Sequence, residues 1–254
     1  MDPEERIAVG FVAAERARRS LIPGAEVVDL DGLVLAFANV NEPELNTVLV
    51  ASAPPDPLAA LQQAEREFEA RSRAFGVDVA AGRHPQVDAC LPTMGLELIL
   101  ERPGMAASIY EMSQPRIPNG IRIEPVTDEA GALALARVDA EAFGGDLRTS
   151  ELFYAPAAFG APGTSSFLAW QGDVAVGSAA GYLYEGAVGV LGVAVVPAAR
   201  RRGIGAALTL AAARAFPGAD LAWLHPSEEA LHMYQELGFM SVSNWQVWTR
   251  AASP

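Results

Sequence analysis

Three arginines and two glycines stand together in the run Arg200-Arg201-Arg202-Gly203-Ile204-Gly205. An apolar run that ends at Pro197 precedes them, and an alanine-rich stretch begins at Ala206. This order predicts a buried strand, a short loop and then a helix. The first N–H groups of a helix have no intrahelical acceptor, and the helix dipole adds about half a positive charge at that end. A pyrophosphate is a natural occupant of such a loop.

The composition around this loop points to the same chemistry. Between Glu185 and Asp220 the chain has no acid but four arginines, although its formal net charge is −13. Gly203 and Gly205 lack a Cβ, so the backbone there can approach a phosphate closely and adopt a positive φ. The segment therefore indicates an anion site in an otherwise acidic protein.

Other phosphate-binding loops fit less well. A Walker A loop needs a Gly-Lys-Ser/Thr sequence, and the chain has no lysine. A dinucleotide-binding fingerprint needs a third glycine, which Ile204 to Leu208 does not supply in register. Asp220 stands at a suggestive distance for a ribose ligand, but that distance alone is not enough.

The pattern Arg200-x-x-Gly203-x-Gly205 resembles the acyl-CoA signature of the GNAT N-acetyltransferase family, Arg/Gln-x-x-Gly-x-Gly/Ala. The resemblance extends over roughly residues 120–250 and includes Val-x-Val-x-Pro before the loop and Tyr234-x-x-Leu237-Gly238-Phe239 after it. It implies acetyl-CoA or CoA as cosubstrate, with pantetheine on main-chain groups of the strand and pyrophosphate on amides of the loop. The implied binding residues are Val193, Val195, Arg200, Arg201, Arg202, Gly203, Ile204, Gly205 and Ala206.

Tyr234 corresponds to the family's usual general acid. When an amine attacks a thioester, the departing thiolate needs a proton, which a tyrosine hydroxyl can give. The other interpretation is a core tyrosine, because Ala230, Tyr234 and Leu237 share one face of a predicted helix.

The general base is left open by the sequence. Family members often carry a glutamate on the strand before the loop, and Val188–Val196 has no acid. His225, at the end of the next predicted strand, is one candidate, and its unperturbed pKa near 6.5 would suit the task. Glu141 and Glu185 are weaker candidates, and a water chain or an amine that arrives neutral are further alternatives.

Aromatic residues gather in the segments that would frame an acceptor pocket. They favour either a pocket for an apolar or ring-bearing substrate or an ordinary core. They are Phe143, Phe153, Tyr154, Trp170, Tyr182 and Tyr184.

The helices and strands that must position these residues are expected to form a mixed α/β fold. This fold is expected in two tandem halves, residues 1–119 and 120–254. Both halves end with strand, His-Pro, short helix, a glycine and a final strand, at His84-Pro85 and His225-Pro226. We interpret this as a duplicated unit.

The expected boundaries follow from hydrophobic periodicity and from turn residues. Thr127 is expected to cap a helix, Pro103-Gly104 to be connecting chain, and 150–159 to be helical. Helices are expected over residues 2–19, 58–75, 86–94, 128–143, 205–216 and 227–237. Strands are expected over residues 27–29, 33–40, 45–51, 77–80, 96–102, 121–124, 166–170, 174–184, 188–196, 220–225 and 242–249.

In the first half, Ala53-Pro54-Pro55-Asp56-Pro57 replaces the phosphate loop. Its three prolines have no N–H, and Asp56 places a negative charge where phosphate would sit. We expect no CoA site in this half.

Composition narrows the function classes. One cysteine and three scattered histidines provide no set of zinc ligands, so we expect no metal. The acidic charge disfavours nucleic acid and membrane partners, and no apolar run is long enough for a span. The acidic start and absence of disulfides favour a cytoplasmic protein, and either a monomer or a homodimer is expected.

Together these observations predict an N-acyltransferase that moves an acyl group, most simply acetyl, from CoA to a primary amine of a small molecule or peptide. The alternative is an acyl-CoA-binding regulatory or interaction module without turnover. The acceptor itself cannot be named, because acceptor specificity rests on loops that vary within one fold.

Overall fold

In a computed structural model of the protein, residues 1–38, 40–41, 45–154 and 160–250 are described. The chain divides into two compact units, each of which combines separate stretches of sequence. Unit one holds Met1–Gly10 and Met105–Met240, and unit two holds Phe11–Gly104 and the residues after Met240. The predicted boundary at residue 119 lies in the connection between the strands β5 and β6 (Leu96–Ser108 and Ile121–Pro125). As a boundary between two tandem domains it stays a prediction.

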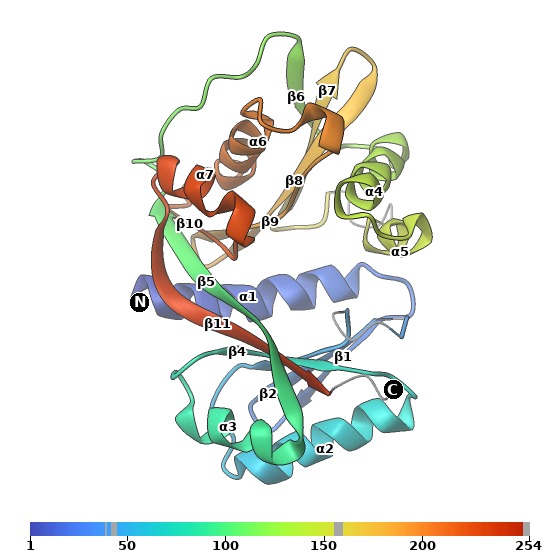
Figure 1. Cartoon of the computed structure of the whole chain (residues 1–254), viewed down its shortest axis with the longest axis vertical. Coiled ribbons are helices and arrows are strands. Elements are labelled where there is room, and N and C mark those ends of the chain that lie inside the picture. Colours follow the sequence, from blue (N-terminus) through green and yellow to red (C-terminus); the bar gives the residue numbers. More distant parts are fainter. Residues whose placement is uncertain (39, 42–44, 155–159, 251–254) are drawn as a thin grey trace. The chain divides into compact units, whose positions relative to one another are not determined.

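Unit one is a mixed sheet with helices on both faces, as Figure 1 shows for α4 and α6. Its strand order is β5-β10-β9-β8-β7-β6. The strands not yet bounded are β7 (Thr164–Gln171), β8 (Val174–Tyr184), β9 (Ala187–Val195) and β10 (Leu221–Leu224). The helices are α4 (Glu129–Phe143), α5 (Leu147–Phe153), α6 (Ile204–Ala213) and α7 (Leu231–Glu236), with short 3-10 turns η4 (Pro197–Ala199) and η5 (Glu228–Ala230).

Unit two has the strand order β1-β2-β3-β4-β11-β5. Its strands are β1 (Glu26–Leu30), β2 (Leu33–Phe37), β3 (Thr47–Val50), β4 (Gly76–Ala80) and β11 (Met240–Arg250). Its helices are α2 (Pro57–Ala70), α3 (Pro85–Cys90) and the 3-10 turn η2 (Pro92–Met94), while α1 (Pro3–Ser20) contributes residues to both units.

The same strand pattern occurs in both units. Three antiparallel strands lead into a helix, and the next strand returns parallel to the third: β4 beside β3 in unit two, and β10 beside β9 in unit one. An antiparallel strand then closes each pattern, β11 on β4 and β5 on β10. The His-Pro pairs follow β4 and β10, as the predicted repeat requires.

The closing strands come from the opposite halves of the chain. Met105–Ser108, which ends the first half, pairs with β10 of unit one, and β11, which ends the chain, pairs with β4 of unit two. Strand β5 therefore runs through Pro103 and Gly104, which were predicted as connecting chain. That prediction is wrong. Glycine at position 104 lets β5 continue beside β11, since a side chain there would collide with Ser243 and Trp245.

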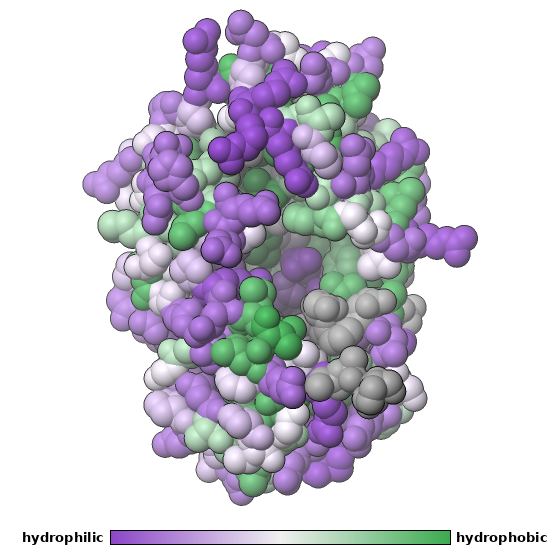
Figure 2. All heavy atoms as spheres, viewed as in Figure 1, coloured by the Kyte–Doolittle hydropathy of each residue, from purple (hydrophilic) through white to green (hydrophobic). Residues whose placement is uncertain are grey.

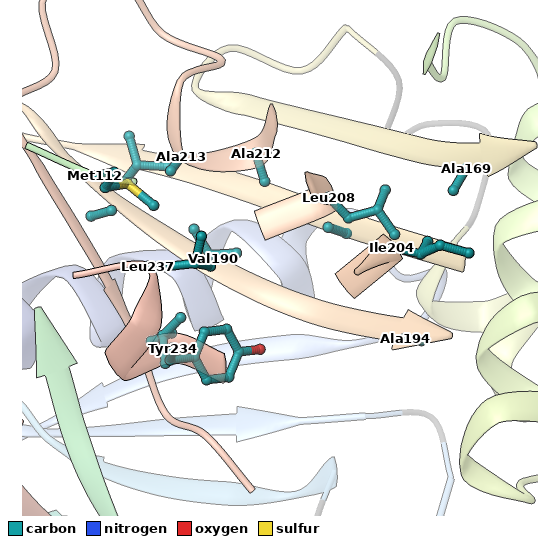
Figure 3. Close-up of a cluster of buried hydrophobic side chains, with 14 of the residues drawn as sticks. Met112, Ala169, Val190, Ala194, Ile204, Leu208, Ala212, Ala213, Tyr234 and Leu237 are labelled. Carbon is teal, nitrogen blue, oxygen red and sulfur yellow. The ribbon is translucent and has the colours of Figure 1, made fainter. Parts of the chain in front are cut away.

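Each unit has its own apolar core. In unit one, α6 covers the sheet with Ile204, Leu208 and Ala212, and Figure 3 shows these side chains together with Val190 and Leu237. In unit two, Phe68 of α2 stacks on Phe75 and makes a tilted contact with Phe37, and all three rings are buried. Burial of these faces supplies the main free energy that holds each unit together.

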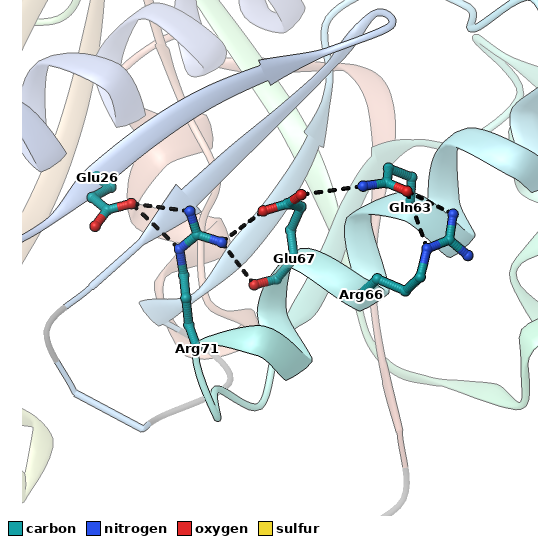
Figure 4. Close-up of polar contacts among 5 residues, drawn as sticks. All are labelled: Glu26, Gln63, Arg66, Glu67 and Arg71. Carbon is teal, nitrogen blue, oxygen red and sulfur yellow. Dashed lines mark hydrogen bonds and ion pairs between the residues drawn. The ribbon is translucent and has the colours of Figure 1, made fainter.

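A polar network on the surface of unit two joins the end of α2 to β1 (Figure 4). The Arg71 guanidinium donates to Glu67 at 2.7 Å and to Glu26 at 3.2 Å and lies 4.3 Å from the Phe37 ring centroid. Glu67 also accepts from Gln63, and Gln63 accepts from Arg66. These contacts are far from the predicted phosphate loop in the sequence, and we assign them no part in the chemistry.

The helix starts follow capping chemistry. Asp128, and not the predicted Thr127, caps α4, because its carboxylate accepts from the Gly131 N–H at 2.8 Å. Asp146 caps α5 in the same way through Thr149. The predicted helix over 150–159 begins earlier, at Leu147, and residues 155–159 lie outside the described part of the chain.

The described residues contain neither a candidate membrane span nor a metal-binding group. None of their helices has the length and apolar character that a membrane span requires. No three His, Cys, Asp or Glu side chains among them are grouped so that they could bind a metal ion.

Candidate active site

The strands β9 and β10 lie side by side over a short distance only. Their parallel register joins Leu221–Trp223 to Ala187–Gly189, and β10 ends at Leu224. Strand β9 continues to Val195, so its second half runs on past the residues that pair with β10.

A bulge interrupts β9 in this second half. Ser178 pairs with Ala194 and Ala180 with Leu191, so that Ala179 of β8 faces two residues, Gly192 and Val193. Gly192 is exposed and has φ +61°, and its carbonyl accepts a hydrogen bond from the Ser178 hydroxyl at 3.3 Å. Bulges bend a strand and leave the extra residue out of the ladder, and they are common beside active sites.

Val193 and Val195, the predicted pantetheine-binding residues, lie in and just after this bulge and are half-buried. The carbonyl of Val195 is already used, because it accepts a hydrogen bond from Arg200 Nε at 3.0 Å. Only the remaining main-chain groups of this stretch are available to a ligand.

The loop after β9 has the backbone geometry of an anion site. Arg201 has φ +62° and Gly203 has φ +81°, and α6 begins immediately afterwards at Ile204. Within the described part of the chain, the N–H groups of residues 201–206 donate to no main-chain acceptor. The first N–H bonded back to the loop is that of Ala207, which donates to the Gly203 carbonyl at 3.1 Å. Left-handed residues alternating with right-handed ones turn successive N–H groups toward one concave side.

The loop is therefore open to a ligand and not closed by protein acceptors. The dipole of α6 adds positive potential at the same place. Figure 2 shows hydrophilic side chains gathered over the part of unit one that carries α6 and α7. An anion is the ligand that these groups fit.

The three arginines of the loop have different surroundings. Arg200 Nη2 donates to the Ala142 carbonyl at the end of α4 at 2.6 Å, so with its bond to Val195 the side chain ties the loop to β9 and α4. Arg202 Nη1 donates to Gln171 at 2.9 Å. Arg201 is exposed. The expectation that all three simply add charge for a phosphate thus needs refining for Arg200, whose guanidinium bonds to main-chain carbonyls.

The residues that begin α6 contribute through their backbone. The Ile204 side chain is buried in the core of unit one, while Gly205 and Ala206 are half-buried. A Cβ on Gly205 would lie 3.3 Å from the sulfur of Met233, so glycine allows α6 and α7 to pack closely here. Any contact of Ile204 with a phosphate would be made by its N–H.

Tyr234 lies on α7 with its ring in the core, 6% exposed, and makes an edge contact with Phe239 at 5.8 Å between ring centroids. Burial raises the pKa of Tyr234 to about 12, against the opposing effect of a hydrogen bond with Thr209. Figure 3 shows the ring beside β9 with its hydroxyl directed toward the Ala194 end of the strand in that view. The residue is both the predicted core tyrosine and a group that stays protonated, and so able to donate a proton, at neutral pH.

The candidate bases lie in different places. His225 follows β10, half-buried, with its ring 5.7 Å from that of Trp223, as expected for two side chains on one strand face. Glu185 occupies the turn between β8 and β9, at the opposite end of β9 from the loop. Glu141 is an exposed residue of α4.

An acid that the sequence analysis did not consider lies beside the bulge. Asp139 of α4 accepts hydrogen bonds from the Tyr154 hydroxyl at 3.0 Å and from the Ser150 hydroxyl at 2.8 Å. The Tyr154 oxygen is 3.1 Å from the point where a Cβ on Gly192 would stand. The sequence spacing of Asp139, Ser150 and Tyr154 does not predict that their side chains meet, because the turn between α4 and α5 brings them together.

The other predicted pocket aromatics have varied surroundings. Phe143 is 65% and Tyr184 39% exposed, so neither is an ordinary core residue. Phe153, Trp170 and Tyr182 are half-buried. Tyr154 lies against the β9 bulge at Gly192.

The start of α2, the position in unit two that matches the start of α6, is built differently. Asp56 caps the helix, with its carboxylate accepting from the Ala59 N–H at 3.1 Å, and Pro57 follows it. A carboxylate of the protein itself thus accepts a hydrogen bond from a helix N–H at that position. This geometry supports the prediction that the first half has no CoA site, which stays a prediction.

Comparisons with known proteins were made on sequence and on structure. Residues 133–239 match the model of the Acetyltransferase (GNAT) family. A search of curated proteins finds no match.

Solved structures share the fold over almost the whole chain. A GCN5-related N-acetyltransferase from Kribbella flavida has a TM-score of 0.80 at 22% identity, covering 100% of this chain and 97% of that one. A tandem GNAT protein from the clavulanic acid biosynthesis pathway has a TM-score of 0.64 at 16% identity, covering 97% and 88%. A GCN5-related N-acetyltransferase from Sphaerobacter thermophilus has a TM-score of 0.59 at 18% identity, covering 96% and 91%.

The family model spans the bulged strand, the open loop and the helix that carries Tyr234, and the structural neighbours extend the likeness over both units. The predicted α/β fold of two tandem halves is confirmed at the level of the fold. Residues 133–239, which hold the predicted acyl-CoA signature, thus match the GNAT acetyltransferase family, and the chain as a whole shares the fold of solved GNAT proteins.

Proposed function

We propose that the protein is an N-acyltransferase that transfers an acetyl or other acyl group from CoA to a primary amine of a small molecule or peptide. The observation that carries the proposal is the open row of N–H groups at residues 201–206, at the start of α6 and directly after a bulged strand. The GNAT family match of residues 133–239 supports it.

The residues present fit the diphosphate of CoA. Arg201 and Gly203, both with positive φ, form the concave backbone, and the α6 dipole and the exposed Arg201 side chain add positive charge. The main chain of β9 before the loop offers N–H and C=O groups for the amides of a pantetheine arm. When bound, acetyl-CoA would supply the activated acyl group.

The protein's own part in the reaction is to orient the reactants and to move protons. An N–H of the bulged strand can polarise a thioester carbonyl as an oxyanion donor does. Tyr234, protonated at neutral pH, gives its proton to the departing sulfur. His225 remains a proposed base alongside a water chain or an amine that arrives neutral.

Ligand binding is tested by thermal unfolding with acetyl-CoA. A ligand at one hundred times its Kd stabilises the folded state by about 2.7 kcal/mol, so the wild-type melting temperature should rise. Gly203→Asp places a negative side chain in the anion site and should abolish the rise. Gly218→Asp is the matched control, because Gly218 has φ +86° and nothing within 4 Å of its Cβ position, outside the loop.

Turnover is tested by thiol release from acetyl-CoA in the presence of a panel of amines. Release with at least one amine is expected. An unchanged melting temperature of the wild type at saturating acetyl-CoA would reject the proposed site. Binding without release from any amine would favour the second candidate, an acyl-CoA-binding module, which the acid-free β9 strand supports.

A further inference from the structure

The apolar strand β8 carries one buried hydroxyl. Ser178 is 1% exposed and is the single polar side chain in the buried stretch Val176–Gly181. Gly177 and Gly181 face α6, so the alternation of side chains along a strand directs Ser178 to the opposite face of the sheet. A hydroxyl buried among small apolar residues needs a hydrogen-bond partner.

Its partner is the backbone of the β9 bulge. The Ser178 hydroxyl donates to the Gly192 carbonyl at 3.3 Å, and its side chain makes no other hydrogen bond among the described residues. Gly192 and Val193 together face Ala179, so the peptide that joins them lies where the ladder is interrupted. The Ser178 hydroxyl therefore holds a peptide whose direction regular strand pairing does not set.

The same hydrogen bond fixes where the other side of that peptide points. The peptide is trans and planar, so the N–H of Val193 points opposite to the carbonyl of Gly192. Because that carbonyl is directed to Ser178 on β8, the Val193 N–H points away from β8. Strand β10 borders β9 on the other edge, and its pairing with β9 ends at Gly189. The N–H thus faces the part of the edge that β10 leaves open.

Glycine at position 192 makes this hydrogen bond necessary. With no Cβ and with φ +61°, Gly192 allows the following peptide to turn over at little steric cost. A reversed peptide would present the Gly192 carbonyl oxygen to the open edge in place of the Val193 N–H. An oxygen at that position would repel the negative charge that develops on a thioester carbonyl under attack.

We propose that Ser178 is a positioning residue for acyl transfer, because its hydroxyl holds the peptide after Gly192 with the Val193 N–H toward the thioester carbonyl. The inference rests on the proposed function. It names the side chain that sets the direction of the oxyanion donor. Ser178 itself contacts no reacting atom, since it lies on β8, on the other side of that peptide.

Ser178 neither takes nor gives a proton in the reaction. The nitrogen lone pair forms the N–C bond while the carbonyl electrons move to the oxygen, which accepts a hydrogen bond from the Val193 N–H. The carbonyl forms again as the C–S bond breaks. The sulfur takes the proton of Tyr234, the nitrogen releases one proton to the base or to water, and Tyr234 regains its proton from solvent.

The first test is Ser178→Ala in thiol-release kinetics with the best amine of the panel. The change removes one hydroxyl and keeps a small residue in the strand. The kcat should fall about tenfold, near the upper limit of what one hydrogen bond contributes to an equilibrium between two orientations. The KM for the amine, and the Kd for CoA, which has no thioester carbonyl, should change less than about threefold.

Infrared spectroscopy of bound acetyl-CoA separates orientation from packing. With an isotopic label in the acetyl carbonyl, a hydrogen bond from the Val193 N–H lowers the C=O stretching frequency relative to the free ligand. We expect this lowering in the wild type and a clearly smaller one in Ser178→Ala. The measurement needs no amine and no turnover, so it reads the N–H direction directly.

Ser166→Ala is the matched control. Ser166 lies on β7, half-buried and opposite Ala180 of β8, and its hydroxyl makes no hydrogen bond among the described residues. The variant loses the same atom one strand further from the bulge. Its kcat and its carbonyl frequency should equal those of the wild type.

The outcomes separate this proposal from the function on which it rests. A wild-type protein that binds acetyl-CoA but releases no thiol with any amine overturns both. A wild-type protein with turnover, in which Ser178→Ala keeps its kcat and its carbonyl frequency, overturns the role of Ser178 alone. If kcat and the melting temperature fall together while the carbonyl frequency stays at the wild-type value, the hydroxyl only ties β8 to β9 and the proposal is rejected.

Discussion

We propose that Tyr234 serves both packing and chemistry. Its ring fills the core of unit one against Phe239, and the same burial raises its pKa to about 12. A group with a pKa that high keeps its proton across the whole working pH range. The two interpretations that the sequence left open, core residue and general acid, are therefore compatible.

Tyr234→Phe should separate them. Because phenylalanine keeps the packing and loses only the hydroxyl, we expect kcat for thiol release to fall at least about 100-fold, with the acetyl-CoA affinity unchanged. In the wild type, no alkaline loss of kcat should come from this group below about pH 10. Tyr110→Phe, at a site 74% exposed, is the control and should behave as wild type. Equal rates for Tyr234→Phe and wild type would remove Tyr234 from the mechanism.

We propose that the arginines of the loop divide into a structural and a ligand-facing role. Arg200→Ala leaves the Val195 and Ala142 carbonyls without their donor, and we expect a loss of roughly 1 kcal/mol in the free energy of unfolding. Arg201→Ala should leave stability unchanged and weaken CoA binding, with a weaker salt dependence of the Kd. Urea unfolding and calorimetric titration at two salt concentrations measure both. A stability loss at Arg201 and none at Arg200 would contradict this assignment.

The loop shows what the residues alone allow one to predict. The order strand, arginines, glycines and helix predicted an open row of N–H groups, because glycine conformation and helix starts are local properties. Where Arg200 points was not predictable, since its acceptor on Ala142 lies 58 residues away and is set by where α4 ends. Asp139 and Tyr154 were missed as a pair for the same reason, because a turn with its own cap brings them together.

At the scale of elements, local signals predicted most helices and strands, and the errors have physical causes. Thr127 and Asp128 are both good caps, and the Gly131 N–H selects the second. Strand β5 continues through a Pro-Gly pair that reads as a turn, because its later residues find a new partner in β10. Partner strands were beyond sequence reasoning, because nothing in the residues of β5 or β11 identifies β10 or β4 as the strand it pairs with.

A buried ionic cluster in unit two joins α1 to β4 and β5. Asp78, 9% exposed, lies 3.3 Å from Arg102, and Glu15 pairs with Arg19 at 3.2 Å. Burial raises the pKa of Asp78 to about 6, against the charge of Arg102. For Glu15, the effect of burial is outweighed by Arg18 and Arg19, which lower its pKa.

The raised pKa of Asp78 has a definite sign for stability. The folded state holds this proton more tightly than the unfolded chain, so its contribution is fully present below about pH 4 and is lost as pH rises through about 6. Glu15 acts in the opposite direction, stabilising above its unfolded pKa and losing that contribution as pH falls.

Asp78→Asn should therefore flatten the stability profile between about pH 4 and 7. At pH 7 the variant no longer has a buried charge to desolvate, which adds at most about 3 kcal/mol to the free energy of unfolding for a two-unit shift. The lost contact with Arg102 reduces this gain. We expect stability at pH 7 equal to or above wild type in urea unfolding. Asp29→Asn, on the exposed strand β1, is the control and should not flatten the profile. A variant that loses stability more at pH 7 than at pH 4 would show that Arg102 dominates.

At the scale of the whole molecule, two copies of one strand pattern carry two different helix starts. The start of α6 offers N–H groups without acceptors, and the start of α2 satisfies its own through Asp56 and has prolines in place of donors. The repeated pattern was visible in the sequence at His84-Pro85 and His225-Pro226. That each pattern takes its closing strand from the other half was not, because a strand's hydrophobic pattern does not identify its partner.

This difference between the copies predicts the binding stoichiometry. Isothermal titration with CoA should give about one site per chain, and Gly203→Asp should remove it entirely. Asp56→Ala should cost about 1 kcal/mol of stability through the lost cap. It should not create a second site, because the prolines of residues 53–57 still lack N–H donors. A stoichiometry of two, or one site that survives Gly203→Asp, would mean that the first half binds CoA and that the prolines and Asp56 do not exclude it.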